Sequence, residues 1–147
     1  MPTRSLSVKD RIAINDLLMA YVYANDTADI EGMVKLFTKD AVLEIPGHGE
    51  RFETREGIRR FATEHGAQPG RRGRQHLYQT VQIKPKGAGC IVRSYWMVVQ
   101  SIVTTNGKII RSMGYYDDHC VKVGGKWLIK HKHMGGWNDE TPPPPPL

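Results

Sequence analysis

The strongest fold signal lies in residues 90–134, which read CIVRSYWMVVQSIVTTNGKIIRSMGYYDDHCVKVGGKWLIKHKHM. This run is rich in Val, Ile, Tyr, Thr and Trp, the residue types that favour β-strands. Three segments of the run have this composition, 90–105, 108–123 and 126–134, and so does the segment 75–84 before it. We predict a strand at each of them.

Two pairs of turn residues separate the last three segments. Asn106-Gly107 is the strongest short hairpin signal, because both residues tolerate the positive φ of a type I′ turn. Gly124-Gly125 has the same chemistry one strand later. The sequence therefore predicts an antiparallel meander, in which neighbouring strands are joined by tight turns.

The N-terminal third has helical periodicity. Ser7 followed by Asp10 is a capping box, in which each side chain can satisfy a free amide of the first turn. The apolar stripe that follows at helical spacing consists of Ile14, Leu17, Leu18 and Tyr21. This pattern predicts a helix over residues 8–25.

Two shorter helices are predicted further along the chain. Asp29 and Thr54 are their candidate N-caps, and Gly66 can stop the second. Their apolar positions are Ile30, Met33, Val34 and Phe37 in the first and Ile58, Phe61 and Ala62 in the second. The connection between them is predicted to hold a strand, a turn and a return strand at 41–45, 46–49 and 51–53.

Helices followed by a long-stranded sheet are the layout of an α+β fold. Such a sheet must bury one face, and the amphipathic helices are the candidates to cover it. We predict a curved antiparallel sheet wrapped around three N-terminal helices, forming a cone with an internal pocket. Residues 1–137 are predicted to be a single domain, and residues 138–147, with five consecutive prolines, an extended polyproline arm.

Composition excludes several classes of protein. A length of 147 residues suits one domain. The formal charge is +6, but the sequence has no helix-turn-helix, zinc-finger or RNP pattern, so we expect no nucleic-acid partner. The chain has no signal-peptide pattern and no apolar run approaching the roughly 20 residues of a membrane span. We therefore expect a cytoplasmic protein with no membrane partner. Cys90 and Cys120 are expected to be free, buried thiols.

Asp26 and His76 are the candidate catalytic pair. Asp26 falls where the first helix must end, and His76 begins the first long strand. Each taken alone suits a structural role, as a helix-boundary carboxylate or a strand-edge imidazole. Together, a carboxylate that accepts the Nδ1–H of an imidazole would leave Nε2 free as a base. No serine or cysteine occupies a nucleophile-elbow motif, so the pair indicates proton abstraction rather than a covalent acyl enzyme.

Short motifs along the chain resemble the SnoaL-like branch of the nuclear-transport-factor-2-like superfamily. They are Ala13–Leu18, Tyr21, Asp26, Leu36–Ala41, Arg74–His76, Ser94–Trp96, Gly114–Asp118 and Gly125–Trp127. The resemblance covers about residues 8–134. It implies a cystatin-like cone, in agreement with the predicted elements.

This resemblance also implies roles for particular residues. Scytalone dehydratases, bile acid 7α-dehydratases and hexachlorocyclohexane dehydrochlorinases pair a carboxylate at the end of the first helix with a histidine at the start of a strand, as base for an elimination. Asp26 and His76 occupy those positions. Tyr21 stands where the bile acid enzymes have an active-site tyrosine, and Lys132 stands where several members carry an arginine.

Strand alternation suggests which residues line the pocket. The candidate substrate-binding residues are Trp96, Tyr116, Ser94 and Leu43. In the last strand, strict alternation puts His131 and His133 on the face of Trp127 and Ile129, with Lys132 on the other. His131 and His133 have a metal-like spacing that His119 could extend, but no motif supplies the required ligand set, so we predict no metal and no cofactor.

The leading functional hypothesis is a cofactor-independent lyase that acts on a small, apolar, cyclic substrate, with His76 as general base. Tyr21, Tyr116 or Lys132 would donate to the leaving group or the oxyanion. A polyketide cyclase or isomerase of the same family is the nearest alternative. A non-catalytic small-ligand binder or a scaffold like a dioxygenase β-subunit is the alternative from another class.

Self-association is also predicted. The outer face of the sheet would carry apolar residues that need cover, namely Ile91, Tyr95, Met97 and Val99. We therefore expect a homo-oligomer, with a trimer favoured over a dimer by the resemblance.

Overall fold

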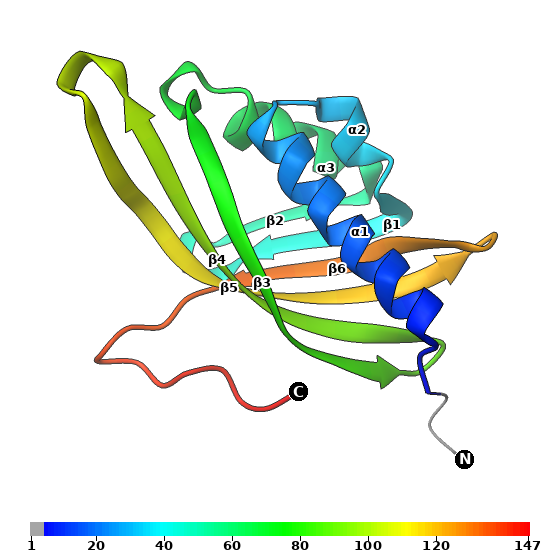
Figure 1. The fold of residues 1–147 in the computed structure, drawn as a ribbon. Coiled ribbons are helices and arrows are strands. Elements are labelled where there is room, and N and C mark those ends of the chain that lie inside the picture. Colours follow the sequence, from blue (N-terminus) through cyan, green and yellow to red (C-terminus); the bar gives the residue numbers. More distant parts are fainter. Residues whose placement is uncertain (1–4) are drawn as a thin grey trace.

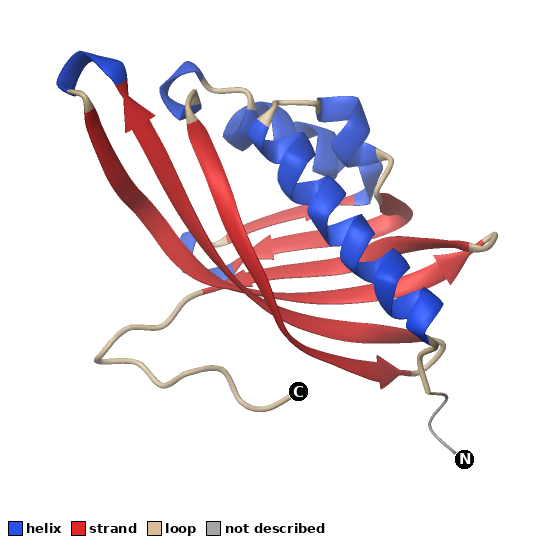
Figure 2. Cartoon of the chain, in the orientation of Figure 1, coloured by secondary structure: helices blue, strands red, loops and turns tan. Residues whose placement is uncertain are grey.

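The computed structural model describes residues 5–147, which form three α-helices and six β-strands (Figures 1 and 2). The helices are α1 (Val8–Asp26), α2 (Ile30–Val34) and α3 (Thr54–Phe61), the last continued by a π-helical turn at Ala62–Gly66. The strands are β1 (Phe37–Ile45), β2 (Glu50–Glu53), β3 (Arg74–Lys86), β4 (Gly89–Ile102), β5 (Gly107–Val123) and β6 (Lys126–Gly135). No helix in this part of the chain is long and apolar enough to cross a membrane.

The strands form one curved, unclosed sheet in the order β2-β1-β6-β5-β4-β3. Strands β3 to β6 are the predicted antiparallel meander. The sheet is not wholly antiparallel, however, because β1 pairs with β6 in the parallel direction. No tight turn joins those two strands, so no hairpin forces them to run in opposite directions. Figure 1 shows the helices gathered on the concave side of the sheet, which is the predicted α+β arrangement.

Local signals at the helix ends were only partly reliable. The Ser7 side chain caps α1 as predicted, accepting from the Asp10 amide at 3.0 Å. The second helix is shorter than predicted, because α2 ends at Val34 and Phe37 already begins β1. Thr54 does not cap α3: Glu53 is the N-cap, and Thr54 is the first helical residue with a φ of 63°.

The two hairpin turns lie where the glycines predicted them. Gly124 and Gly125 both have positive φ, as a type I′ turn requires. The other turn is longer than predicted, since a 3-10 turn at Val103–Thr105 precedes Asn106, and Asn106 takes the positive φ there without Gly107.

A β-bulge in β6 overturns the alternation expected there. His119 of β5 pairs with His131, whereas the next residue, Cys120, pairs with Ile129, so Lys130 is an extra residue in β6. One extra residue reverses which face the following side chains occupy. Lys132 therefore turns inward with Ile129 and is completely buried, while His131 and His133 turn to the opposite face, beside Glu44.

The core fills the space between the helices and the concave face. The predicted stripe of α1 is buried in it, and the two thiols, which are free, lie opposite each other across β4 and β5. On the other face, Tyr95 is 43% exposed, close to the exposed Leu77 and Met113. Self-association through that apolar face stays a prediction.

The C-terminal segment lies against the outside of the sheet. No helix or strand follows Gly135 within the described residues. Arg93 donates a hydrogen bond to the carbonyl oxygen of Pro145, and Lys84 donates one to that of Leu147 at 2.7 Å. The proline-rich tail is therefore held to β3 and β4 by backbone acceptors, which proline retains although it has no N–H.

Stability is expected to fall as the pH drops from 7 to 5. Burial lowers the pKa of His119, His131 and His133 below the usual 6.5, so the folded chain binds protons less readily than the unfolded chain. The stability associated with these groups is present above about pH 6.5 and is lost as they are forced to protonate. The urea midpoint should decrease over this window, and the double variant H119Q/H131Q should decrease less. A midpoint that is constant or rises on acidification would contradict this expectation.

Candidate active site

Asp26 and His76 meet directly, although 50 positions separate them in the chain. Asp26 ends α1, and His76 lies two residues after the start of β3. The Asp26 Oδ1 atom is 2.5 Å from His76 Nδ1, and Oδ2 accepts the His76 backbone N–H at 2.9 Å. The carboxylate thus holds both the ring and the backbone of the histidine, which restricts the ring to one orientation.

The far side of the imidazole faces Asn25. The Asn25 Nδ2 atom is 3.4 Å from His76 Nε2, so the amide can donate to the ring nitrogen when the ring proton is on Nδ1. The His76 side chain is only 6% exposed, and Asn25 is buried as well. Asn25 was not predicted, because an asparagine beside an aspartate at a helix end has no pattern that distinguishes it from an ordinary terminus.

His76 lines a cavity of about 510 Å³ between the helices and the sheet. Asp26 does not line this cavity and lies behind the imidazole. The other lining residues that matter for chemistry are Asn25, His65, Arg71, Arg74, Trp96 and Tyr116. This volume is within the usual range for a small-molecule site, about 300–1,000 Å³.

Two of the predicted binding residues form an aromatic wall of this cavity. The rings of Trp96 and Tyr116 stack with centroids 5.5 Å apart and an interplanar angle of 23°. The indole lies over Gly114, where a Cβ would come within 2.8 Å of it, so a larger residue would displace the ring. The Trp96 indole nitrogen is buried without a hydrogen-bond partner among residues 5–147. The wall thus offers a flat apolar surface.

The other two predicted binding residues do not line the cavity. Leu43 is completely buried in the hydrophobic core. Ser94 is also buried, and its hydroxyl donates to the Tyr78 hydroxyl at 2.5 Å. Both share the concave side of the sheet with Trp96, but other side chains cover them. Alternation identifies a face and does not say which part of that face is open.

Lys132 and Tyr21 are likewise placed inside the core. Lys132 Nζ is 3.0 Å from both carboxylate oxygens of Asp118, and it lies 4.0 Å and 3.7 Å from the ring centroids of Tyr21 and Tyr116. Burial lowers the pKa of Lys132 and raises that of Asp118, and their mutual attraction opposes both shifts. Tyr21 points into this cluster because five residues on a helix separate it from Asp26 by about 140°.

Two arginines enter the cavity, Arg71 from the connection before β3 and Arg74 from the first position of β3. Arg74 is 8% exposed and its Nε donates to the Arg71 carbonyl oxygen at 3.1 Å. Arg71 Nη2 is 3.5 Å from His65 Nδ1. The sequence analysis did not place either arginine in the cavity, although Arg74 belongs to the motif Arg74–His76.

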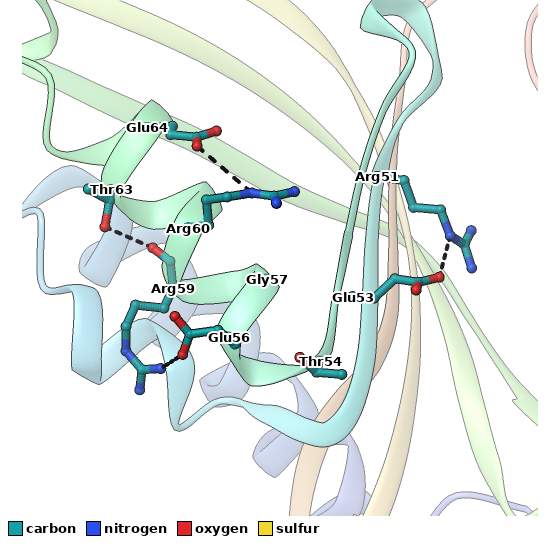
Figure 3. A pocket seen from close by; sticks show the side chains of 9 residues that line it. All are labelled: Arg51, Glu53, Thr54, Glu56, Gly57, Arg59, Arg60, Thr63 and Glu64. Atoms are coloured by element: carbon teal, nitrogen blue, oxygen red, sulfur yellow. Dashed lines mark hydrogen bonds and ion pairs between the residues drawn. The ribbon is translucent and has the colours of Figure 1, made fainter.

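A larger depression of about 780 Å³ lies on the other side of α3 (Figure 3). Its charged residues satisfy one another: Arg51 pairs with Glu53, Arg59 with Glu56 and Arg60 with Glu64. Neighbouring ion pairs leave no reactive group free there, so the cavity at His76 is the candidate active site. No cluster of three or more His, Cys, Asp or Glu side chains suited to a metal ion occurs within residues 5–147.

Comparisons with known proteins agree with this fold. The family model for the SnoaL-like domain matches residues 7–133. No curated protein matches the chain significantly.

Several solved structures are similar over most of the chain. An aspartate-to-asparagine variant of the Mycobacterium tuberculosis protein Rv3472, of unknown function, has a TM-score of 0.74 and 25% identity, covering 87% of this chain and 76% of its own. A candidate scytalone dehydratase from Novosphingobium aromaticivorans has a TM-score of 0.73 and 22% identity, covering 86% and 83%. ActVI-ORFA from Streptomyces coelicolor has a TM-score of 0.71 and 16% identity, covering 89% and 98%.

Proposed function

Since the chain belongs to the SnoaL-like domain family, which includes dehydratases and polyketide cyclases, we propose that it is a cofactor-independent lyase. The reaction is the elimination of water from a small cyclic substrate held in the cavity at His76. The observation that carries this proposal is the 2.5 Å contact between Asp26 and His76 on the wall of that cavity.

His76 acts as the general base. The substrate replaces the long 3.4 Å contact of Asn25 at Nε2. Nε2 then removes a proton from a carbon next to a carbonyl group, the C–H electrons form the new double bond, and the C–O bond of the β-hydroxyl breaks. Asp26 accepts the Nδ1–H and stabilises the imidazolium that forms. The proton then passes from Nε2 to the departing hydroxide, which leaves as water and restores the neutral base.

Tyr116 is the donor that we assign to the oxygen atoms of the reaction. Its ring lines the cavity, whereas Tyr21 and Lys132 do not. Burial raises the pKa of Tyr116, so the phenol keeps its proton at neutral pH and can donate a hydrogen bond. Lys132 and Tyr21 are assigned the supporting role of packing beneath Tyr116.

The wild-type protein is expected to dehydrate at least one member of a panel of cyclic β-hydroxy ketones and β-hydroxy acids. Mass spectrometry distinguishes the alternatives, because elimination removes one water and intramolecular cyclisation by aldol addition leaves the mass unchanged. A new ultraviolet absorbance from the conjugated product provides an independent readout. A panel that binds without any change in mass or absorbance would favour a binding protein and contradict the lyase.

A further inference from the structure

The cavity at His76 contains cationic groups that the proposed proton transfer does not use. Arg71 and Arg74 both line it, and neither forms an ion pair with a carboxylate among residues 5–147. By contrast, Arg93 on the outer face is paired with Asp117 at 2.8 Å. Arg74 is buried and Arg71 is partly buried, and a guanidinium removed from water without a counter-ion is unfavourable.

Nearby charges do not balance the two arginines. Burial is the main cause that lowers the pKa of both, and the neighbouring Arg111 lowers it further. Two carboxylates partly oppose these shifts without pairing with either arginine: Asp26 binds His76, and Glu50 Oε1 is 3.2 Å from His65 Nε2. The wall therefore has an excess of positive charge, which a bound anion would relieve.

We infer that the substrate is a cyclic carboxylic acid, whose carboxylate is bound by Arg71 and Arg74 while its ring lies against Trp96 and Tyr116. This inference rests on the proposed function, because it takes the same cavity as the substrate site. A guanidinium presents its N–H groups in a planar fork that matches a carboxylate in two parallel hydrogen bonds. The stacked pair of Trp96 and Tyr116 supplies a flat surface for a ring.

The carboxylate also explains how a small substrate is oriented. Arg74 lies two residues from His76 on the same strand, so both side chains project from the start of β3 into the cavity. Anchoring the anion at Arg74 fixes the distance and direction from the ring to Nε2 of His76. Binding of the carboxylate therefore also positions the carbon that loses its proton next to the base.

Binding of benzoate tests this inference without requiring the natural substrate. Isothermal titration calorimetry is performed with benzoate, its uncharged analogue benzamide, and inorganic phosphate. Wild-type protein is expected to bind benzoate at least about 10-fold more tightly than either of the others. Because hydrogen bonds to charged groups contribute about 1.5–3 kcal/mol, Arg74→Gln should weaken benzoate binding about 10- to 150-fold and leave benzamide binding unchanged.

Two variants control for charge and for turnover. Arg72→Gln removes an equal charge from the same loop, but Arg72 is exposed and does not line the cavity, so benzoate binding should be unchanged. His76→Gln should strongly slow dehydration and retain benzoate binding, so the failure of the lyase proposal and the failure of this inference give different results. If Arg74→Gln does not fold, judged by circular dichroism, Arg71→Gln replaces it with the same expectation.

Several outcomes would overturn the inference. They are equal affinity for benzoate and benzamide, phosphate binding as tight as benzoate binding, the same loss in Arg72→Gln as in Arg74→Gln, and no benzoate binding at millimolar concentration. An Arg74→Gln variant that loses only kcat while binding benzoate normally would also contradict it, because the arginine would then act on the transition state and not on a carboxylate of the substrate.

Discussion

Replacing His76 by glutamine is expected to lower kcat for dehydration by about 10²–10⁴-fold, the usual contribution of a positioned general base. Glutamine keeps most of the side-chain volume and can still donate a hydrogen bond to Asp26, so the cavity should retain its shape. It has no nitrogen able to take up a proton, however, so the elimination loses its positioned base and proceeds only slowly. The rate of water loss, measured on whichever substrate of the panel the wild type converts, gives the effect directly.

A second readout separates base catalysis from binding. In deuterium oxide, the wild type should exchange the proton next to the carbonyl group of the substrate, and the H76Q variant should not. His131→Gln is the matched control, since that imidazole lies on the opposite face of the sheet and should leave both rates unchanged. The same rate of water loss in H76Q and wild type would contradict the assignment of His76.

Asp26→Asn tests how the base is positioned. The amide can occupy the same space, but it cannot stabilise the imidazolium, and it can favour the tautomer with the proton on Nε2. Dehydration should therefore fall while the binding of benzoate by the arginines is retained. The variant should remain folded, because the amide oxygen can still accept the His76 backbone N–H.

Replacing Lys132 by alanine is expected to reduce the free energy of unfolding by about 3–5 kcal/mol, the cost of breaking a buried ion pair from one side. Lys132 and Asp118 are both completely buried, and each is the other's only charged partner within hydrogen-bonding distance among the described residues. Removing the ammonium leaves the Asp118 carboxylate without a counter-ion, and it also takes the cation away from the Tyr21 and Tyr116 rings. Urea denaturation measures the loss.

The double variant K132M/D118L is the control for this effect. It removes both charges and keeps apolar volume, so no unpaired ion is left in the core, and it should recover most of the stability lost in K132A. A loss below about 1 kcal/mol in K132A would mean that the pair is not insulated from water. If K132A is as stable as the wild type but no longer dehydrates the substrate, Lys132 has the catalytic role that the family resemblance implied.

The strands and α1 could be predicted because their signals are local. The cap at Ser7, the apolar stripe of α1 and the glycines at 124 and 125 act over only a few residues, and the structure confirms each of them. Where the local signals were ambiguous, tertiary contacts decided the secondary structure. Phe37 continues the helical pattern of the preceding residues, but it pairs with Ile129 and is the first residue of β1. The parallel pairing of β1 with β6 had no local signal at all.

In the candidate active site, too, the sequence predicted some features and the tertiary structure decided the others. The family resemblance identified Asp26 and His76 as candidates. The sequence between them does not show that Asp26 Oδ1 lies 2.5 Å from His76 Nδ1 in the folded chain. The inward direction of Lys132 depends on one extra residue in β6, at Lys130, which strict alternation could not anticipate. Nothing in the sequence placed Arg71 and Arg74 in the cavity, because their position there depends on how the segment before β3 lies against the sheet.

The amino-acid sequence by itself determined α1, the strands of the meander and the turn at Gly124 and Gly125, because backbone preferences and apolar periodicity depend on neighbours a few residues away. Only the tertiary structure decided the contents of the cavity, which side chains face it and which charges remain unpaired there. Those properties depend on strand register, on the bulge in β6 and on packing between distant segments. The neighbouring residues in the sequence do not determine any of these.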